Sequence, residues 1–314
     1  MDIDFHFSMV YVLARWAGFG SDNARLLATC SQLVDDNVDD KVPQFSAFSQ
    51  RFSGHELWEN VREVENAEIW VPFHFLPALD GDTLDQQLVC RKNSKMAQAL
   101  AADMLTYSDE NRLFRLGIAL HVYADTWAHQ EFSGITSAGN TLLGLNSQPE
   151  QKIGLEWLKH EVSPWVNLKP LGHAAALHFP DQPYLYWHSE QKFPEGRRNW
   201  GEFMEAARAL YRILCVVGEN PETELSSRQE LFLTKSFQEI QDEDCNARNE
   251  TWLQRIQTNY FEFDELTELD QCLKYQPGLI MADADYPALF YQGIEEHYAW
   301  VKSQLETAGL EDVI

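Results

Sequence analysis

The chain has 314 residues, of which 45% are hydrophobic, so it is long enough for one large domain or two ordinary ones. Its 49 acidic and 24 basic residues give a formal net charge of −25 at pH 7. Because nucleic-acid duplexes and anionic membranes require positive potential, this charge disfavours both as the main partner. A small anionic substrate stays compatible with the composition, since bound divalent cations invert the local field of an acidic protein.

The sequence contains no recognisable export or membrane signal. No apolar run approaches about twenty residues, which predicts that there is no transmembrane segment. The opening MDIDFHFSMVYVLARWAGFG is acidic before its apolar part and lacks the basic region of a signal peptide. The five cysteines are widely separated and form no Cys-x-x-Cys pair, which argues against a cysteine zinc site. Free thiols without a leader predict a cytoplasmic protein.

Helical spacing of apolar residues dominates the chain. Residues 133–151, rich in Gly, Ser, Asn and Thr, are expected to form a loop, and much of 163–187 is expected to be irregular because it contains four prolines. We find no convincing alternating strand pattern. Helices are predicted over roughly 22–38, 55–66, 93–107, 111–132, around Glu156, and over 200–217, 228–241, 247–260 and 286–306.

These elements predict an all-α protein, a multi-helix bundle that forms a single domain over residues 1–314. The polar candidates described below fall within about residues 1–218. A C-terminal helical extension is expected over about residues 225–314.

The helix predicted over 111–132 carries the pattern His121-x-x-x-Asp125-x-x-x-His129. Residues four apart lie on one face of a helix, so these side chains form a polar stripe about two turns long. The surrounding residues are apolar, and a buried polar stripe needs a partner. One interpretation is an internal hydrogen-bond network. The other is a metal site, because neutral imidazole and carboxylate are preferred zinc ligands, and three such residues in register favour it.

Further histidines and aspartates have apolar neighbours. His6 lies in MDIDFHF, His74 in IWVPFHFLP and His173 in LGHAAAL. Asp35 and Asp36 end the first long helix, where carboxylates oppose the helix dipole and a cation would compensate them. Each alone is usually a core residue or a solvated helix end, but a bundle that gathers them inward would form a multi-metal site. The histidines in polar company are expected outside it: His55, His188 and His297.

This order of motifs resembles the zinc-dependent phospholipase C and P1 nuclease superfamily, all-α proteins with a trinuclear zinc cluster. The matching stretches are MDIDFH, TCSQLVDD, WVPFHF, HVYADTWAH and the Gly-His pair at His173, in the order of the family and over roughly residues 1–181. The opening MDIDFH and the stretch GHAAALHFPDQPYLYW also resemble an uncharacterised bacterial family that we associate with this superfamily.

The resemblance implies three zinc sites, two of which share a carboxylate. The implied ligands are Asp35, His74, His121 and Asp125 for one ion; Asp125, His6 and, as our candidate, Asp4 for a second ion; and His129, His173 and, as our candidate, Asp181 for the third. The cluster would hold two or three zinc ions, with iron or manganese as alternatives.

The N-terminus and the central helix depart from the family pattern. Family members use the amino and carbonyl groups of a mature N-terminal tryptophan as ligands, whereas this chain begins with Met1 and is expected to have no leader. Asp4 is therefore the expected substitute. The family's next histidine commonly follows the aspartate by six residues, but His129 follows Asp125 by four.

The final carboxylate is also displaced. It usually follows its histidine by four residues, and that position is Leu177 here. Asp181 is the candidate in its place, and Glu156 with His160 is the fallback pair. The third site is the one that these departures put in question.

The resemblance and the ligand types predict a metal-dependent hydrolase of phosphate esters, either a phosphodiesterase or a phosphomonoesterase. Asp125 would bridge metal ions, and Asp36, as an unligated carboxylate, would position the attacking water. Arg197 and Arg198 are candidates for contacting the substrate phosphate, although adjacent arginines are more often simply exposed. The acidic composition favours a small substrate over a nucleic-acid duplex.

Two other functions are compatible with the same residues. The first is a non-enzymatic, acidic helical binding protein with a protein partner, in which the His and Asp cluster is structural. The second is another metal-dependent reaction, such as amide hydrolysis or diiron oxidation. Diiron bundles usually carry paired Glu-x-x-His motifs, and none is evident in this sequence.

Overall fold

The computed structural model describes residues 1–37, 63–150, 171–278 and 285–314. Over these residues the protein is mainly helical, as the sequence predicts, and it also contains one small antiparallel sheet. The helix predicted around Glu156 and residues 55–62 of another predicted helix lie outside the described residues.

The described elements follow one another in a chain of helices that is interrupted once by strands. The α-helices are α1 (Val10–Trp16), α2 (Ser21–Asp36), α3 (Glu63–Phe73), α4 (Leu84–Gln87), α5 (Lys95–Met104), α6 (Arg112–Ala128), α8 (Asn199–Val217), α9 (Ser227–Glu239), α10 (Cys245–Gln257), α11 (Glu268–Gln271) and α13 (Tyr286–Thr307). A π-helix, η1 (Asp4–Met9), precedes α1, and the short 3₁₀ turns are η3 (Ala138–Asn140), η4 (Ala174–Ala176) and η5 (Phe179–Asp181). The strands are β1 (Asn146–Gln148), β2 (Tyr186–Ser189) and β3 (Phe193–Arg198).

The expectation that the chain lacks strands is wrong between α6 and α8. The central strand β2 pairs antiparallel with β1, where Trp187 lies opposite Ser147, and with β3, where Trp187 lies opposite Arg197. The strands are three to six residues long, and regular alternation of buried and partly buried residues extends over only four residues in β2. A period of two over so few residues does not stand out in a sequence.

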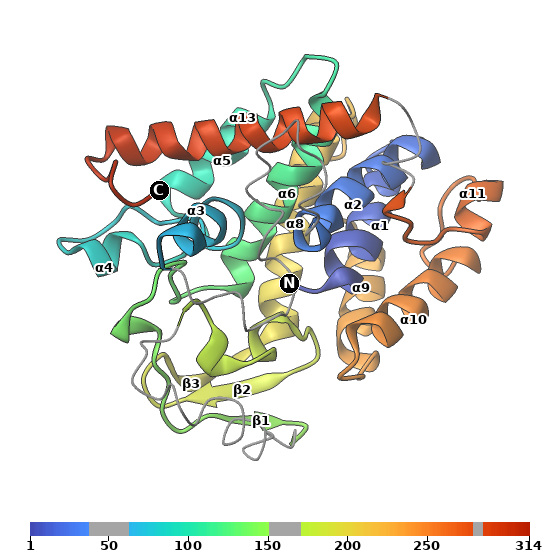
Figure 1. Ribbon diagram of the computed structural model, residues 1–314. Helices are drawn as coiled ribbons and strands as arrows, with labels where there is room; N and C mark the ends of the chain where they lie inside the picture. The colour runs from blue at the N-terminus through green and yellow to red at the C-terminus, as the bar shows by residue number, and fades with distance from the viewer. Residues whose placement is uncertain (38–62, 151–170, 279–284) are drawn as a thin grey trace.

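Helix α6 lies at the centre of the molecule (Figure 1). It packs against α2, α8 and α13, and every residue from Leu116 to Ala128 is buried. Gly117 permits the close approach of α2, because a Cβ atom there would lie 2.6 Å from both Cys30 Cβ and the Leu27 carbonyl oxygen. The polar stripe predicted on this helix is therefore buried inside the protein, with other helices packed around it.

The helices after residue 225 pack onto the core rather than away from it. Helix α10 packs against η1, and α13 packs against α6 and α3. In Figure 1, α13 crosses the molecule over α6, and the N-terminus lies near the middle of the molecule. Both ends of the chain thus contribute to the surroundings of α6.

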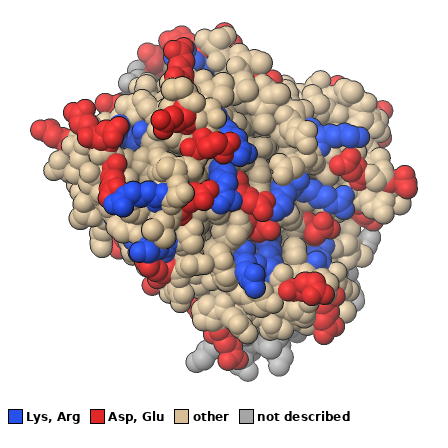
Figure 2. All heavy atoms as spheres, turned by 180° about the vertical axis from the view of Figure 1, so that it is seen from behind, with Lys and Arg blue, Asp and Glu red and all other residues tan. Residues whose placement is uncertain are grey.

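The surface carries both signs of charge. Figure 2 shows one face of the molecule, on which Lys and Arg side chains lie interspersed with Asp and Glu. Among the described residues, no helix combines the length and the apolar character that crossing a membrane requires.

Candidate metal centre

The N-terminal segment enters the interior and places His6 beside α6. Every residue of η1 is buried. The Asp2 carbonyl oxygen accepts hydrogen bonds from the amides of Phe5 and His6, at 2.9 and 3.0 Å, and so begins the turn that carries the imidazole. The α-amino group of Met1 lies 2.6 Å from Asp125 Oδ1. The first residues of the chain therefore reach the polar stripe of α6.

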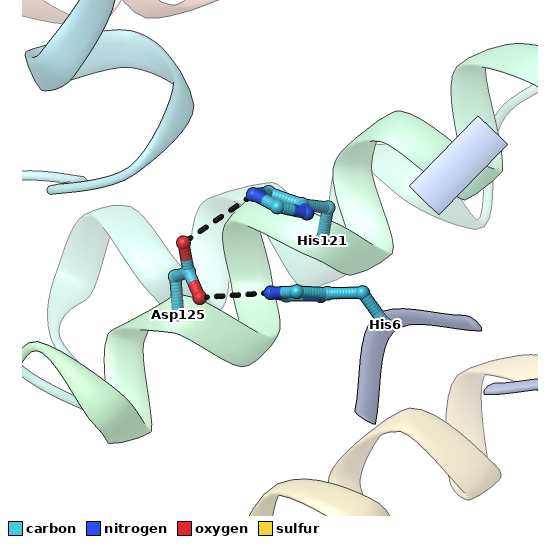
Figure 3. Close-up of side chains that lie close together, drawn as sticks. All are labelled: His6, His121 and Asp125. Carbon is cyan, nitrogen blue, oxygen red and sulfur yellow. Dashed lines mark hydrogen bonds and ion pairs between the residues drawn. The ribbon is translucent and has the colours of Figure 1, made fainter. Parts of the chain in front are cut away.

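His6, His121 and Asp125 form the first of three groups whose ligand atoms all lie within 4.8 Å of one another (Figure 3). His6 Nε2 lies 3.2 Å from Asp125 Oδ1, and His121 Nε2 lies 3.4 Å from Oδ2. The two imidazole rings stack with their centroids 3.8 Å apart. The carboxylate thus presents a separate oxygen to each imidazole, as a carboxylate that bridges two ions does.

Asp35, His74 and His121 form the second group, at the ends of α2 and α3 and in the middle of α6. His74 Nδ1 and His121 Nε2 each lie 3.7 Å from Asp35 Oδ1 and 3.4 Å from each other. Both nitrogens also lie within 3.5 Å of Asp125 Oδ2. The Asp35 side chain keeps 23% of its surface exposed, more than any other member of the three groups, so solvent reaches the centre at this point.

His129, His173 and Asp181 form the third group. His129 Nε2 lies 3.1 Å from Asp181 Oδ1, and His173 Nε2 lies 3.3 Å from Oδ2. On the other side of each ring, His129 Nδ1 lies 2.7 Å from the His74 carbonyl oxygen, and His173 Nδ1 lies 2.8 Å from the Leu177 carbonyl oxygen. A carbonyl oxygen only accepts, so both rings carry a proton on Nδ1, and Nε2 is the ring nitrogen that faces Asp181.

Beyond the 2.6 Å contact with the Met1 ammonium, the distances from Asp125 to the neighbouring imidazoles are compatible with ligands of a shared ion. Zinc bonds of about 2.0–2.1 Å at tetrahedral angles place two ligand atoms about 3.3–3.4 Å apart. The nitrogen–oxygen pairs of the first two groups are 3.2–3.7 Å apart. Asp125 Oδ2 has no hydrogen-bond partner among the described residues, although it is fully buried. A cation would remove the cost of this buried, unpaired oxygen.

Burial favours the neutral form of His6, His74, His121 and His173. It lowers the pKa of His74 and of His173 to about 4. It also lowers the pKa of His121, and it lowers the pKa of His6 well below the usual value. Neutral imidazole is the form that binds metal ions, so no proton has to leave these rings at pH 7.

Positive neighbours keep two of the carboxylates ionised. Burial raises the pKa of Asp125 and of Asp181. For Asp125, nearby His129 and then the Met1 ammonium outweigh burial, and for Asp181 the Met1 ammonium is the largest opposing influence, so both pKa values fall well below the usual range. For the Met1 amino group, burial lowers the pKa, and the carboxylates of Asp125 and Asp181 outweigh it and raise the pKa to about 11. Burial and then the charge of Asp125 raise the pKa of Asp35 well above its usual value.

Two expected site residues lie outside the three groups. Asp4 is buried, but it accepts hydrogen bonds from the Arg248 guanidinium and does not replace the N-terminal amino group, which itself reaches Asp125. Asp36 lies exposed at the end of α2, next to Asp35, and accepts a hydrogen bond from the Tyr275 hydroxyl at 2.6 Å. The fallback pair, Glu156 and His160, lies outside the described residues.

The two adjacent arginines have different environments. Arg198 is exposed, but Arg197 is buried and donates hydrogen bonds of 2.7 Å to the carbonyl oxygens of Trp127 and Ala128. Helix α6 ends at Ala128 rather than near residue 132, so its last carbonyls need donors from elsewhere. Arg197 therefore caps the helix, and the expectation of plain exposure is wrong for Arg197 and correct for Arg198.

Local sequence patterns do not mark Arg248, which binds Asp4, as a residue near the centre, whereas they do carry a signal for His297. His297 lies outside the three groups, as expected. It is nevertheless buried, and its Nε2 lies 3.0 Å from the carbonyl oxygen of Pro72, which precedes His74 by two residues. Its helical spacing from Ile294 and Val301, which are both buried, places it on the apolar face of α13.

A mainly helical scaffold that collects buried histidines and aspartates around one carboxylate defines a protein with a candidate multi-ion metal centre. Residues 1–305 match a family of unknown function, DUF6765, and the chain belongs to this family. No curated protein and no solved structure matches the chain. The matched range includes every residue of the three groups.

Proposed function

We propose that the protein is a metal-dependent hydrolase of phosphate esters that uses two or three zinc ions. The observation that carries the proposal is the convergence of two His and Asp groups around Asp125, with a third group at Asp181, all at ligand-like distances. Imidazole and carboxylate ligands suit zinc, and iron and manganese are the alternative metals. The motif order that resembles phospholipase C and P1 nuclease supports a phosphate ester as the substrate class.

The residues present fit such a cluster. Asp35, His74 and His121 would hold one ion, and His6 would hold the second, with one oxygen of Asp125 turned toward each ion. His129, His173 and Asp181 of the third group would hold the third ion.

The Met1 amino group is an additional nitrogen donor beside the second ion. At neutral pH it carries a proton that the neighbouring carboxylates stabilise, as its pKa of about 11 indicates. An ion that binds to this nitrogen would displace that proton, so metal uptake would release it to the solvent.

Bound zinc ions would lower the pKa of water at the site and offset the charge of the phosphate. The chain's own residues supply the rest of the arrangement. Asp35 is the exposed edge of the centre, and we assign the orientation of the attacking water to the adjacent Asp36 carboxylate, which the Tyr275 hydroxyl holds. The enclosed helix α6 keeps bulk water from the remaining ligands.

A small substrate suits this setting better than a nucleic-acid duplex. The net charge is −25, and the face in Figure 2 mixes both signs instead of presenting one basic surface. Duplex binding depends on Lys and Arg side chains that neutralise many phosphates along one surface. A phosphate ester that is neutralised by metal ions needs no such surface.

Elemental analysis of protein purified without chelators or affinity metals tests the proposal, on the wild type and on Asp125→Ala. We expect two or three ions per chain, largely lost in the variant, and hydrolysis of bis(p-nitrophenyl) phosphate or p-nitrophenyl phosphate by the wild type alone. Stoichiometric metal without hydrolysis of either ester would favour another metal-dependent reaction. A folded wild type that takes up no zinc, iron or manganese on reconstitution would contradict the proposal and favour the structural cluster of a binding protein.

A further inference from the structure

Arg248, on α10, is fully buried and is surrounded by acceptors. Its Nε donates to Asp4 Oδ2 at 3.1 Å, and one terminal nitrogen donates to Asp4 Oδ1 at 3.3 Å and to the Asp2 carboxylate. The other terminal nitrogen donates to the carbonyl oxygens of Asp242 and Glu243, at 2.7 and 3.3 Å. A guanidinium has five N–H donors, and this set of contacts uses all of them.

The two carboxylates that Arg248 binds flank the turn that carries His6. Asp2 begins this turn through its carbonyl oxygen, and Asp4 is the first residue of η1. A second contact from the same helix holds the end of the turn, because the Ser8 hydroxyl donates to Asn249 Oδ1 at 2.7 Å. Helix α10 therefore fixes the N-terminal segment on both sides of His6.

Stability alone does not account for a fully buried arginine with two aspartates. Replacing a buried ion pair by apolar residues of similar volume is often neutral or stabilising, by about 1–4 kcal/mol. What such a pair does supply is direction, since a planar fork binds a carboxylate in one orientation. The orientation matters here because His6 Nε2 must stay 3.2 Å from Asp125 Oδ1 for both to share an ion.

We propose that Arg248 is a positioning residue of the metal centre, which orients His6 and the chain's first residues toward Asp125 through Asp2 and Asp4. The effect of Arg248 on metal binding rests on the proposed function. The helix that was expected as part of a C-terminal extension thereby sets the geometry of the second ion site. Groups that orient metal ligands typically change metal affinity by about 10- to 100-fold when they are removed.

The test compares Arg248→Met and Arg248→Lys with a matched control, Arg255→Met, on the same helix. Arg255 also forms an ion pair, 3.0 Å from Glu239, but it does not contact the N-terminal segment in any of its hydrogen bonds. Zinc affinity is measured by competition with a chromogenic chelator, and amide hydrogen exchange of residues 1–9 is measured on the metal-free proteins by mass spectrometry.

We expect Arg248→Met to weaken the binding of one zinc ion by about 10- to 100-fold, to leave the ion of the third group in place, and to speed exchange over residues 1–9. Arg248→Lys should restore part of the affinity, and Arg255→Met should behave like the wild type in both measurements. Wild-type zinc affinity and wild-type exchange in Arg248→Met would overturn the proposal.

A second variant covers the case in which Arg248→Met does not fold. The triple variant Asp2→Asn, Asp4→Asn, Arg248→Met leaves no buried charge unpaired, and the same loss of zinc affinity and faster exchange are expected from it, while wild-type values would overturn the proposal. If the wild type itself binds no zinc, the proposed function fails, and the exchange of residues 1–9 still decides whether Arg248 orders this segment.

Discussion

Asp125→Asn and Asp181→Asn should remove different ions from the centre. Each substitution keeps the size of the side chain and removes one negative charge. Asp125 belongs to the first group and lies within 3.5 Å of two nitrogens of the second, whereas Asp181 belongs to the third group alone. We therefore expect Asp125→Asn to lose the two ions of the first and second groups, and Asp181→Asn to lose only the ion of the third group.

The two substitutions should also lower stability. The Asp125 side chain is 1% exposed, and its Oδ1 lies 2.6 Å from the buried Met1 ammonium. Removing one partner of a buried ion pair costs about 3–5 kcal/mol, because the other charge stays buried and unpaired. We expect a loss of this size for metal-free Asp125→Asn. The loss for Asp181→Asn should be smaller, because the ammonium lies 3.2 Å from Asp181 and keeps its shorter contact with Asp125.

Elemental analysis after dialysis against metal-free buffer gives the ion count, and urea unfolding gives the free energy. Asp270→Asn is the matched control, because Asp270 is a fully buried carboxylate that binds Tyr11 and Arg15 and belongs to none of the three groups. It should be destabilised and yet keep all its ions. A wild-type ion count in Asp125→Asn, or the loss of every ion in Asp181→Asn, would refute the assignment of ligands to groups.

Three further outcomes are expected. In the metal-free protein, burial holds the pKa of His74 and of His173 at about 4, whereas unfolded histidine titrates near 6.5, so at these residues the unfolded state binds more protons between the two values. Each histidine should lower stability by about 1.4 kcal/mol per pH unit from pH 6.5 toward 4, while the raised pKa values of Asp35 and Asp2 act in the opposite direction, and NMR titration of the imidazole protons isolates the two rings. Gly117→Ala should cost about 1–3 kcal/mol in urea unfolding, because its Cβ would overlap α2. Arg197→Met should cost about 1–3 kcal/mol, because the Ala128 carbonyl loses its donor while the Trp127 carbonyl keeps Gln130 Nε2, whereas Arg198→Met should change stability by less than about 0.5 kcal/mol.

Titration of both imidazoles near pH 6.5 in the folded, metal-free protein would show that the two histidines are not buried in neutral form. A neutral Gly117→Ala would contradict the close approach of α2 and α6. Equal melting temperatures for the two arginine variants would contradict the capping role of Arg197.

Local patterns were enough to predict the helices and the polar stripe of the centre. The helix bounds predicted from apolar periodicity agree with the structure to within a few residues at each end for α2, α6, α8, α9, α10 and α13. Each of these helices buries an apolar face, which produces the periodic pattern. The i, i+4 spacing of His121 and Asp125 likewise fixes their shared face before any tertiary contact is known. Helix α3 was missed for the most part, and it carries Pro72 in its last turn.

The parts that sequence reasoning could not supply depend on distant partners or on irregular backbone. Asp4 was preferred over the Met1 amino group because its partner, Arg248, is 244 residues away. The third group departs from the expected spacing because the chain after His173 turns twice, through η4 and η5, before it delivers Asp181. Leu177, which holds the position of the expected carboxylate, has a φ of 55° and contributes its carbonyl oxygen to His173 instead.

The contact between Arg248 and Asp4 has a consequence for the order of folding. The ribosome adds about 5–20 residues per second, so the first residues wait on the order of 10–50 seconds before their anchor is synthesised. During that time α2 and α6 can pair, since both lie in the first half of the chain, but the segment that carries His6 lacks its partner. The centre is therefore completed last, after nearly the whole chain has emerged, and metal ions would be fully bound only by a finished protein.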